Sequence, residues 1–369
     1  MKPAENFLQQ QLDRRQEHGL LRKLNHSKAP IDFCSNDYLG FARSEQLKQL
    51  IHEEIAQIEG VKNGATGSRL LSGNDPYTEA TEHSLADFYG AAAGLIFNSG
   101  YDANIGLLSS IPQRGDTIIL DELIHASLID GARLSHAERY KFKHNDVADL
   151  EKKLQSAKGL IYVVVESVYS MDGDQAPLQS ISELCLRYQA NLIVDEAHAV
   201  GIFGKQGKGL IDHFQLHGQI FARIVTFGKA LGTHGAIVLG SNTLRNYLIN
   251  FARSFIYTTA APLSHIVAVQ CAHRLMAIGK ESEILLQKIN LYQQLANDLM
   301  PSDSAIQTIL YHNNSSAKQA AQKLQQQGFD VRAILSPTVP TGSERLRICL
   351  HSYNTDNEII ALVNHLKTS

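Results

Sequence analysis

The sequence carries no strong excess of charge of either sign. Its 369 residues include 34 Lys and Arg against 37 Asp and Glu, which gives a formal net charge of −3. A near-neutral chain has no electrostatic basis for nucleic acid or an anionic membrane as its main partner. No apolar run approaches the roughly 18 residues that a membrane-spanning helix needs, and the opening MKPAENFLQQQLDRRQ lacks the apolar segment of a signal peptide. We therefore expect a cytoplasmic protein with no nucleic-acid or membrane partner.

Cysteine is sparse and scattered. The four cysteines, at positions 34, 185, 271 and 349, form no Cys-x-x-Cys pair. This spacing argues against a zinc ribbon and fits free thiols in a reducing cytosol. We therefore predict no metal site.

Several familiar catalytic motifs are also missing. The chain has no G-x-S-x-G elbow, no H-E-x-x-H and no G-x-G-x-x-G after a strand. The letters DEAH at 195–198 suggest a nucleotide hydrolase, but that chemistry needs an upstream G-x-x-x-x-G-K-[ST] phosphate loop. None of the four Gly-Lys pairs in the chain has a Gly five residues before its own Gly, so this function is excluded.

What the sequence does contain is an alternation of helix-like stretches with short apolar runs, from about residue 47 onward. Continuous apolar runs bounded by Gly, Asp or Ser are typical of strands buried on both faces, as in a parallel sheet with crossover helices. The runs lie at 94–100, 116–122, 159–167, 191–198, 223–230 and 235–240. The pattern predicts an α/β fold with an open sheet of about six or seven strands.

The two ends of the chain differ from this central region. The N-terminal end holds a polar helix, from Asn6 to about Lys23, and then a short strand and turn in IDFCSNDYLG. The last hundred residues combine a long helix, from about Pro262 to Ala277, with further helices and with strands at 306–312, 329–335 and 345–351. We expect an N-terminal segment at 1–43, a large domain at 44–265 and a small α+β domain at 266–369.

Polar side chains follow the expected strands, at the edge where open parallel sheets place their chemistry. Asp195 and His198 come directly after the apolar run NLIV. An acidic residue that closes a buried strand needs a cationic or hydrogen-bonding partner. An equally weighted alternative is that Asp195 caps the next helix and that His198 is a satisfied core histidine.

Lys229 stands just past another apolar run, which ends at Thr226. Most lysines in such a place extend to solvent, but burial can lower the pKa of the amine and make it a Schiff-base nucleophile. An amine, a carboxylate and a hydroxyl-rich cradle at a helix N-terminus together form the donor set that pyridoxal 5'-phosphate (PLP) needs. The other candidates for that set are Asp195, His125, His198, Ser170, Thr226 and the Gly100-Tyr101 turn. The ordered set, rather than any one member, indicates a PLP site.

Three further features allow both a structural and a functional interpretation. His125 could cap a helix or stack on the cofactor ring. Arg345 and Arg347 alternate along one strand and so share a face, where they are either solvated on an edge strand or placed to grip an amino-acid carboxylate. The loop GATGSRLLSGN at 64–74 could cradle an anion or simply turn the chain.

The chain also resembles a known family along nearly its whole length. The motifs that carry the resemblance are SNDYLG (35–40), NSGYDAN (98–104), HASL (125–128), SVYSMDGDQAPL (167–178), VDEAHAVGIFGKQGKG (194–209), TFGKALG (226–232) and VPTGSERLRICLHSYNT (339–355). They resemble the α-oxoamine synthases, fold-type-I PLP-dependent transferases that join an amino acid to an acyl thioester and release carbon dioxide. The resemblance implies a mostly parallel seven-stranded sheet with helices on both faces and a small C-terminal α+β domain.

Within this family, FNSGYDANIGLLS, SMDGDQAPL and RLRICLH are most similar to the members of biotin synthesis that condense L-alanine with a pimeloyl thioester, carried by CoA or by acyl carrier protein. The resemblance implies that Lys229 binds PLP covalently and later removes the Cα proton of alanine. Asp195 would pair with the pyridinium nitrogen and His198 with the phenolate oxygen, while His125 would stack on the ring.

The resemblance also implies contacts to the rest of the cofactor and to the substrates. The cofactor would be held in addition by Gly100, Tyr101, Ser170 and Thr226. The reacting centre would be lined by Glu166 and Asn36, and the substrate carboxylate would bind Arg347. Arg22 and Thr338 would contact the acyl substrate. The family works as a homodimer with sites at the interface, where Thr258 and Thr259 would serve the phosphate of the partner.

Three other functions stay open from the sequence. Sister synthases use nearly the same cofactor set with glycine or serine and another acyl-CoA. An aminotransferase would share the fold and convert a 2-oxo acid without a thioester. A non-catalytic scaffold subunit would be expected to lack the imine lysine, and Lys229 is present.

Overall fold

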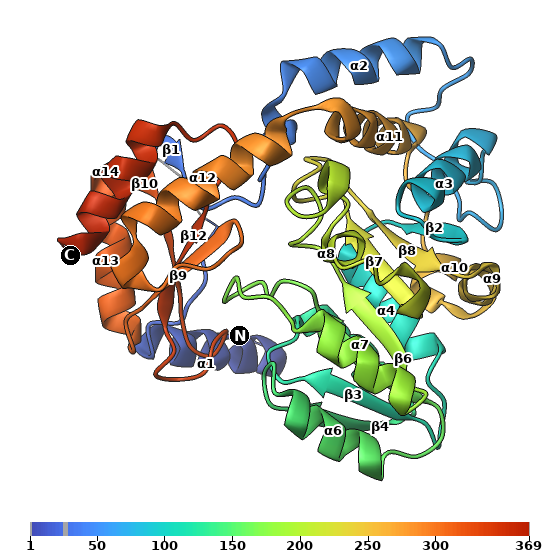
Figure 1. Ribbon diagram of the computed structural model, residues 1–369, viewed down its shortest axis with the longest axis horizontal. Helices are drawn as coiled ribbons and strands as arrows, with labels where there is room; N and C mark the ends of the chain where they lie inside the picture. Colours follow the sequence, from blue (N-terminus) through green and yellow to red (C-terminus); the bar gives the residue numbers. More distant parts are fainter. Residues whose placement is uncertain (1, 25–28, 369) are drawn as a thin grey trace.

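The computed structural model describes residues 2–24 and 29–368 of the chain (Figure 1). The α-helices are α1 (Pro3–Glu17), α2 (Glu45–Ala56), α3 (Pro76–Phe88), α4 (Gly100–Ser110), α5 (Ala126–Leu134), α6 (Val147–Ser156), α7 (Leu178–Arg187), α8 (Leu210–His213), α9 (Asn242–Phe251), α10 (Arg253–Ile256), α11 (Leu263–Ile278), α12 (Glu281–Leu295), α13 (Asn314–Gln326) and α14 (Asp356–Lys367). The strands are β1 (Ile31–Asp32), β2 (Ala93–Phe97), β3 (Thr117–Asp121), β4 (Glu138–Phe142), β5 (Ile161–Glu166), β6 (Asn191–Asp195), β7 (Ala222–Thr226), β8 (Ala236–Gly240), β9 (Ile306–Leu310), β10 (Phe329–Asp330), β11 (Arg332–Ile334) and β12 (Arg345–Cys349).

A seven-stranded sheet forms the centre of the molecule, in the order β2-β8-β7-β6-β5-β3-β4. The pairs β3–β4, β3–β5, β5–β6 and β6–β7 are parallel, whereas β8 is antiparallel to both of its neighbours. This mostly parallel sheet confirms the predicted fold class. The six apolar runs supply every strand except β4, whose residues ERYKF are exposed at four of five positions.

Helices bury both faces of this sheet. Along β5, Tyr162 and Val164 pack on the layer that includes α4, α5 and α9, whereas Val163 and Val165 pack on the layer of α6, α7 and α8. The alternation follows from the two-residue period of a strand. Because both faces are covered, the strand sequence is apolar throughout, as the sequence pattern indicated.

The C-terminal part contains a three-stranded antiparallel sheet, ordered β11-β12-β9, and β1 pairs in parallel with β10. Arg345 and Arg347 therefore lie on the central strand β12 and not on an edge, and both are buried. The alternative in which both arginines are solvated on an edge strand is therefore wrong. The proposed boundary at 265/266 falls inside α11, which is followed by α12 against the small sheet (Figure 1), and we keep the three-part division as a proposal.

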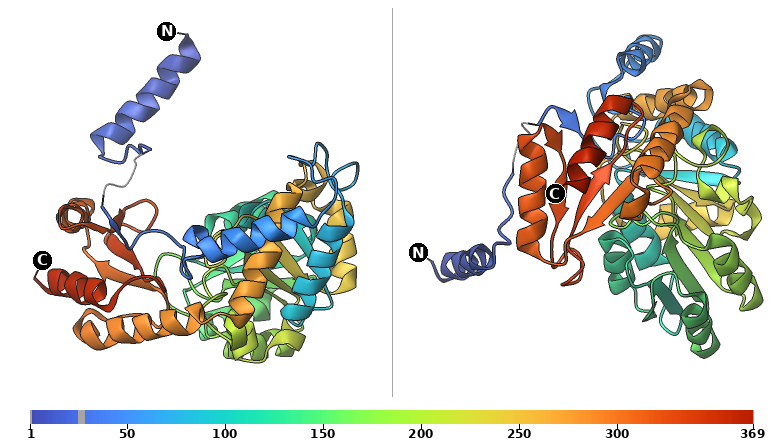
Figure 2. Two further views of the ribbon diagram at one scale, coloured as in Figure 1. Left: turned by 90° about the horizontal axis from the view of Figure 1, so that it is seen from above. Right: turned by 60° about the vertical axis from the view of Figure 1, so that its left-hand side comes forward.

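The N-terminal helix stands apart from the rest of the molecule. Figure 2 shows α1 projecting from the body, and none of its described residues is buried. It ends at Glu17, six residues before the predicted end at Lys23, because Gly19 adopts a left-handed conformation with φ of 65° just past the end.

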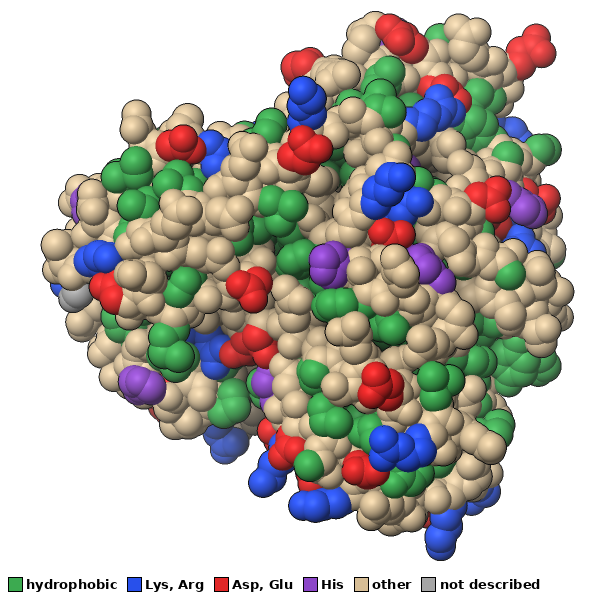
Figure 3. Space-filling view, in the orientation of Figure 1, with side chains coloured by type: hydrophobic (Ala, Val, Ile, Leu, Met, Phe, Trp, Pro, Cys, Tyr) green, Lys and Arg blue, Asp and Glu red, His purple; other side chains and the backbone are tan. Residues whose placement is uncertain are grey.

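The surface is mixed in character. Figure 3 shows positive and negative side chains interspersed over one face of the molecule. Among the helices of the described ranges, none is both long and apolar enough to cross a bilayer.

Candidate active site

Two carboxylates meet at the edge of the large sheet where its parallel strands end. Glu166 is the last residue of β5 and Asp195 is the last residue of β6, and they are partners in the register. Both are buried, with 2% and 6% of their surface exposed. Burial, together with the nearby charge of Asp195, raises the pKa of Glu166 to about 8. At neutral pH Glu166 is therefore largely protonated.

Asp195 is held by donors on both oxygens. Its Oδ1 accepts from the backbone amide of Ala197 at 2.9 Å, and its Oδ2 accepts from Asn104 Nδ2 at 2.9 Å. Asn104 also donates to Ser127 Oγ at 2.9 Å. The sequence argument did not select Asn104, although it lies in the motif NSGYDAN; nothing in a single sequence shows that one turn of α4 places it on Asp195.

His125 caps a helix, which was its structural alternative, and it also lies at the site beside Glu166. It is the N-cap of α5, where its Nδ1 accepts from the backbone amide of Ser127 at 3.2 Å. Its own backbone amide donates to Glu166 Oε1 at 2.6 Å. The residue is exposed. Capping uses the ring nitrogen Nδ1, whereas stacking would use the face of the ring, so the two roles do not compete for the same atoms.

Lys229 belongs to a buried chain of hydrogen bonds. Its Nζ lies 2.8 Å from His198 Nε2, and His198 Nδ1 lies 2.7 Å from the hydroxyl of Tyr38. Burial lowers the pKa of Lys229 to about 8, although Asp195 and Glu166 act in the opposite direction. Burial and the neighbouring amine also hold the pKa of His198 well below its usual value, so this imidazole is neutral.

The chain of contacts continues into the C-terminal sheet. The Tyr38 hydroxyl donates to Asn36 Oδ1 at 3.1 Å, and Arg347 Nη2 donates to the same oxygen at 2.9 Å. Arg347 Nε donates to the backbone carbonyl of Ser170 at 2.7 Å. The structure thus brings Lys229, His198, Asn36, Arg347 and Ser170 together and adds Tyr38 from the motif SNDYLG.

The N-terminus of α4 lies at the same edge of the sheet. Ser99 caps this helix, and Gly100 is its first residue. A Cβ at position 100 would lie 3.4 Å from Thr226 Oγ1, so the helix start and this hydroxyl are in contact. Tyr101 directs its side chain away, donating to Asp130 Oδ2 at 2.6 Å, so only its backbone amide is placed for the predicted contact.

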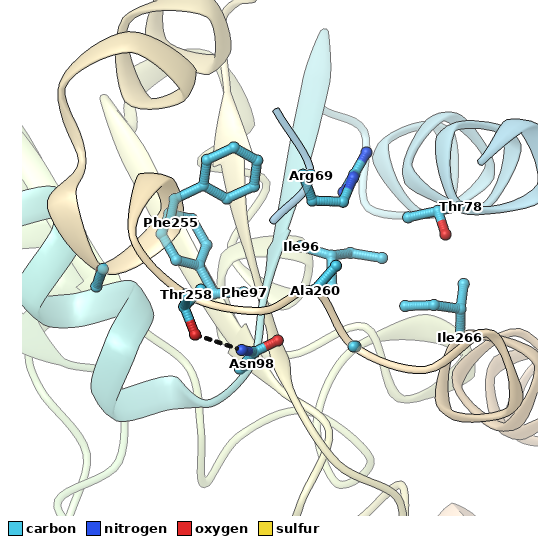
Figure 4. A pocket seen from close by; sticks show the side chains of 11 residues that line it. Arg69, Thr78, Ile96, Phe97, Asn98, Phe255, Thr258, Ala260 and Ile266 are labelled. Atoms are coloured by element: carbon cyan, nitrogen blue, oxygen red, sulfur yellow. Dashed lines mark hydrogen bonds between the residues drawn. The ribbon is translucent and has the colours of Figure 1, made fainter. Parts of the chain in front are cut away.

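Thr258 lies beside the segment that leads into α4. Figure 4 shows a small pocket with the bond from Asn98 Nδ2 to Thr258 Oγ1, which measures 3.0 Å. Asn98 also donates to the carbonyl of Thr259 at 2.8 Å. The predicted service of Thr258 and Thr259 to a partner's phosphate stays a prediction.

Arg22 and Thr338 form a separate pair. Arg22 Nη2 donates to Thr338 Oγ1 at 3.3 Å although 316 positions separate them, and both residues are exposed. Within residues 2–24 and 29–368, neither residue hydrogen-bonds to the buried groups described above. The two residues predicted to contact the acyl substrate therefore meet each other but not the buried groups around Lys229.

The loop at 64–74 has a structural role that the sequence left open. Arg69 donates to Glu82 Oε1 at 2.7 Å, and Arg245 reaches the other oxygen of Glu82 at 3.0 Å. This buried carboxylate anchors the loop to α3.

The residues at this edge fit PLP in their chemistry. An amine with a pKa of about 8 is available at Lys229, and the buried carboxylate of Asp195 can oppose a ring cation. The N-terminus of α4, with the hydroxyl of Thr226 against it, suits a phosphate group because backbone amides and the helix dipole both favour anions there.

Comparison with known sequences gives a consistent result. The model of the family described as aminotransferase class I and II matches residues 28–366. The 8-amino-7-oxononanoate synthase of Emericella nidulans is 40% identical, over 98% of this chain and 94% of the relative. The enzyme of the same name from Lysinibacillus sphaericus is 38% identical, over 95% of each chain.

Solved structures agree on the fold. A serine palmitoyltransferase from S. paucimobilis with a bound PLP–myriocin aldimine superposes with a TM-score of 0.89 at 26% identity, covering 100% of this chain and 98% of that one. An 8-amino-7-oxononanoate synthase from Francisella tularensis superposes with a TM-score of 0.77 at 29% identity, covering 92% and 97%.

Proposed function

The chain belongs to the class I and II aminotransferase family and is a PLP-dependent α-oxoamine synthase; we propose that it condenses L-alanine with a pimeloyl thioester to give 8-amino-7-oxononanoate, carbon dioxide and the free thiol, in biotin synthesis. The observation that carries this proposal is the 38–40% identity, over nearly the full chain, to two proteins named 8-amino-7-oxononanoate synthase. The serine palmitoyltransferase from S. paucimobilis, with a TM-score of 0.89, is only 26% identical.

The proposed roles follow from what each side chain is able to do. When bound, PLP supplies an electron sink for a carbanion at the Cα of the amino acid. Lys229 holds the cofactor and, with a pKa of about 8, both accepts and returns a proton at Nζ near neutral pH. Asp195 supplies a fixed anion toward the pyridine nitrogen, and Asn104 keeps its Oδ2 in place.

Glu166 and His198 complete the electrostatics around the amine. Glu166 is largely protonated at neutral pH, so it adds little charge next to Asp195. His198 is neutral, and its Nε2 faces Lys229 at 2.8 Å. A neutral imidazole can exchange hydrogen bonds with the amine, or with the phenolate oxygen of the cofactor, without taking up the proton that Lys229 must carry.

Arg347 is the proposed grip on the amino-acid carboxylate. Its guanidinium is buried and is oriented by Asn36 and by the carbonyl of Ser170. A planar guanidinium held in this way can accept a carboxylate in a bidentate manner. Arg22 and Thr338, which form an exposed pair, are proposed for the acyl substrate.

We also propose that the protein is a cytoplasmic homodimer whose sites lie at the subunit interface. Thr258 and Thr259 would then stand at the phosphate of the partner subunit. Sedimentation of the PLP-loaded protein tests the dimer; a monomer with full activity would contradict it.

A substrate panel tests the reaction. The purified, PLP-loaded protein is assayed for thiol release with L-alanine, glycine and L-serine, each paired with pimeloyl-, acetyl-, succinyl- and palmitoyl-CoA. We expect L-alanine with pimeloyl-CoA to give the highest kcat/KM and a stoichiometric release of carbon dioxide. A clear preference for glycine or serine would assign the chain to a sister synthase, and amino transfer to a 2-oxo acid without thioester would assign it to the aminotransferases.

A further inference from the structure

A second ionic cluster, partly buried, lies at the same edge of the large sheet, outside the groups assigned above. Its centre is His144, in the loop that follows β4. Its Nδ1 lies 2.9 Å from Asp121 Oδ1, and its Nε2 lies 2.7 Å from Asp174 Oδ2. The ring also packs edge-on against Tyr169, with centroids 4.4 Å apart.

The imidazole must be charged to serve both carboxylates. A neutral ring has one N–H and would turn a lone pair toward one of the two aspartates. Burial alone would lower the pKa of His144, but the bonds to Asp121 and Asp174 outweigh it and raise the pKa to about 10. Glu122 also contacts this residue, because its Oε1 accepts from the backbone amide of His144 at 3.0 Å.

Each aspartate stands at the base of a segment that carries proposed site residues. Asp121 ends β3, four positions before His125. Asp174 belongs to residues 167–176, which form a hairpin closed by an antiparallel bridge between Val168 and Gln175; we call this segment the Ser170 hairpin. Asn145 reinforces the base by donating to Asp174 Oδ2 at 2.7 Å.

The tip of the Ser170 hairpin is seated on the C-terminal sheet. Figure 1 shows the green loop between β5 and α7 reaching toward the strands of that sheet. The carbonyl of Ser170 accepts from Arg347 Nε at 2.7 Å, and Asp172 pairs with Arg345. Gly173 packs so closely on Ile306 that a Cβ added at position 173 would lie 2.2 Å from the carbonyl oxygen of Ile306. A shift at the base of the hairpin therefore moves the carbonyl that orients Arg347.

We propose that His144 is a positioning residue for the amino-acid site: by donating to Asp121 and Asp174 at once, it fixes the base of the Ser170 hairpin and thereby seats Arg347. It acts only through these segments, because its ring contacts Asp121, Asp174, Asn145 and Tyr169. This inference rests on the proposed function, since it assigns Arg347 to the amino-acid carboxylate.

The variant His144→Gln tests the inference in the PLP-loaded enzyme. Small displacements of a positioning group cost up to about 100-fold, so we expect the Kd for L-alanine, followed by the absorbance of the bound cofactor, to rise by about 10- to 100-fold. At saturating L-alanine, kcat should change much less. His217→Gln is the matched control, because His217 also pairs with an aspartate, Asp212 at 3.5 Å, in a part of the molecule away from the hairpin; its Kd should match the wild type.

Two further measurements separate positioning from a general loss of structure. Asp172→Asn loosens the tip of the same hairpin, so its effect on the Kd should be non-additive with that of His144→Gln, whereas independent structural effects would add. Asp174→Asn weakens the pairing of His144 with Asp174 from a half-exposed position, and it should also raise the Kd for L-alanine. If His144→Gln does not fold, this variant tests the positioning role instead.

The outcomes are distinct from those of the proposed function. If wild-type enzyme shows no response to L-alanine, the proposed function fails. If the wild type responds and both His144→Gln and Asp174→Asn bind L-alanine normally, the positioning role is overturned. Nitrogen NMR of the histidine rings, assigned with His144→Gln, should show His144 doubly protonated at about pH 8; a neutral ring there would also overturn it.

Discussion

Glu166 and Asp195 lie opposite each other at the ends of β5 and β6, with both carboxyl groups buried. Two adjacent buried carboxylates cannot both ionise cheaply, and the structure resolves this by keeping Glu166 protonated near neutral pH. This relationship keeps Glu166 largely uncharged beside Asp195 near neutral pH and determines how the protein should respond to pH.

The first prediction concerns Glu166→Gln. The folded pKa of Glu166 lies near 8, above the ordinary value of 4.5, so the folded state binds the extra proton between these values. Its contribution to stability is therefore complete below pH 4.5 and is lost as pH rises through about 8, by at most about 1.4 kcal/mol per pH unit. Glutamine mimics the protonated form, so the melting temperature of the cofactor-free variant should fall less over this range. A variant that follows the wild-type curve would contradict the assigned pKa, and Glu54→Gln, whose partner Arg274 lowers the pKa, serves as control.

The second prediction concerns the amine of Lys229. Burial lowers its pKa from 10.5 to about 8, so acetylation of Lys229 in cofactor-free protein, followed by mass spectrometry, should have a midpoint near pH 8. Asp195 raises this pKa, and Asp195→Asn should therefore move the midpoint lower. Asp116→Asn, at the opposite edge of the sheet, should leave it unchanged. A midpoint near 10.5 would show that the amine is not buried in solution.

The third prediction concerns Asn104, which anchors Asp195. Leucine at this position removes the donor to Asp195 Oδ2. A hydrogen bond to a charged group contributes about 1.5–3 kcal/mol, so the Kd for PLP, measured by equilibrium dialysis, should rise roughly 10- to 100-fold. Asn191→Leu is the control. Asn191 begins β6, the strand that ends at Asp195, and its side chain donates to a backbone carbonyl at the end of the strand far from Asp195. Equal PLP affinity in the two variants would remove the assigned role of Asn104.

The fourth prediction concerns Arg347→Lys. Lysine keeps the charge but cannot form the planar double contact with a carboxylate, so the KM for L-alanine should rise at least about tenfold, with a smaller change in the KM for the thioester. Arg332→Lys is the control, since Arg332 is the register partner of Arg347 on β11 and is less buried. A rise confined to the thioester would place Arg347 on the acyl side instead.

The sequence predicted the large sheet well because its strands are buried on both faces and therefore apolar throughout. It missed β4, where four of five residues are exposed. Their charged or polar side chains leave no apolar run from which a strand could be predicted. It also placed Arg345 and Arg347 on an edge strand, since strand order within the small sheet depends on pairing partners far away in the chain.

For the site, the sequence identified the residues at strand ends but not the partners that orient them. Tyr38 and Asn104 contact His198 and Asp195 across 160 and 91 positions. Such contacts arise from tertiary packing, and no local pattern of hydrophobicity or spacing encodes them. The motifs SNDYLG and NSGYDAN contain both residues, which was the only signal available for them.

The central claim is that Lys229 is the amine that binds PLP covalently. The most direct test is borohydride reduction of the PLP-loaded protein, followed by proteolysis and mass spectrometry of the peptides. We predict a pyridoxyl phosphate adduct on Lys229, absent from Lys229→Ala. An adduct on another lysine, or none at all in protein that contains the cofactor, would contradict the account.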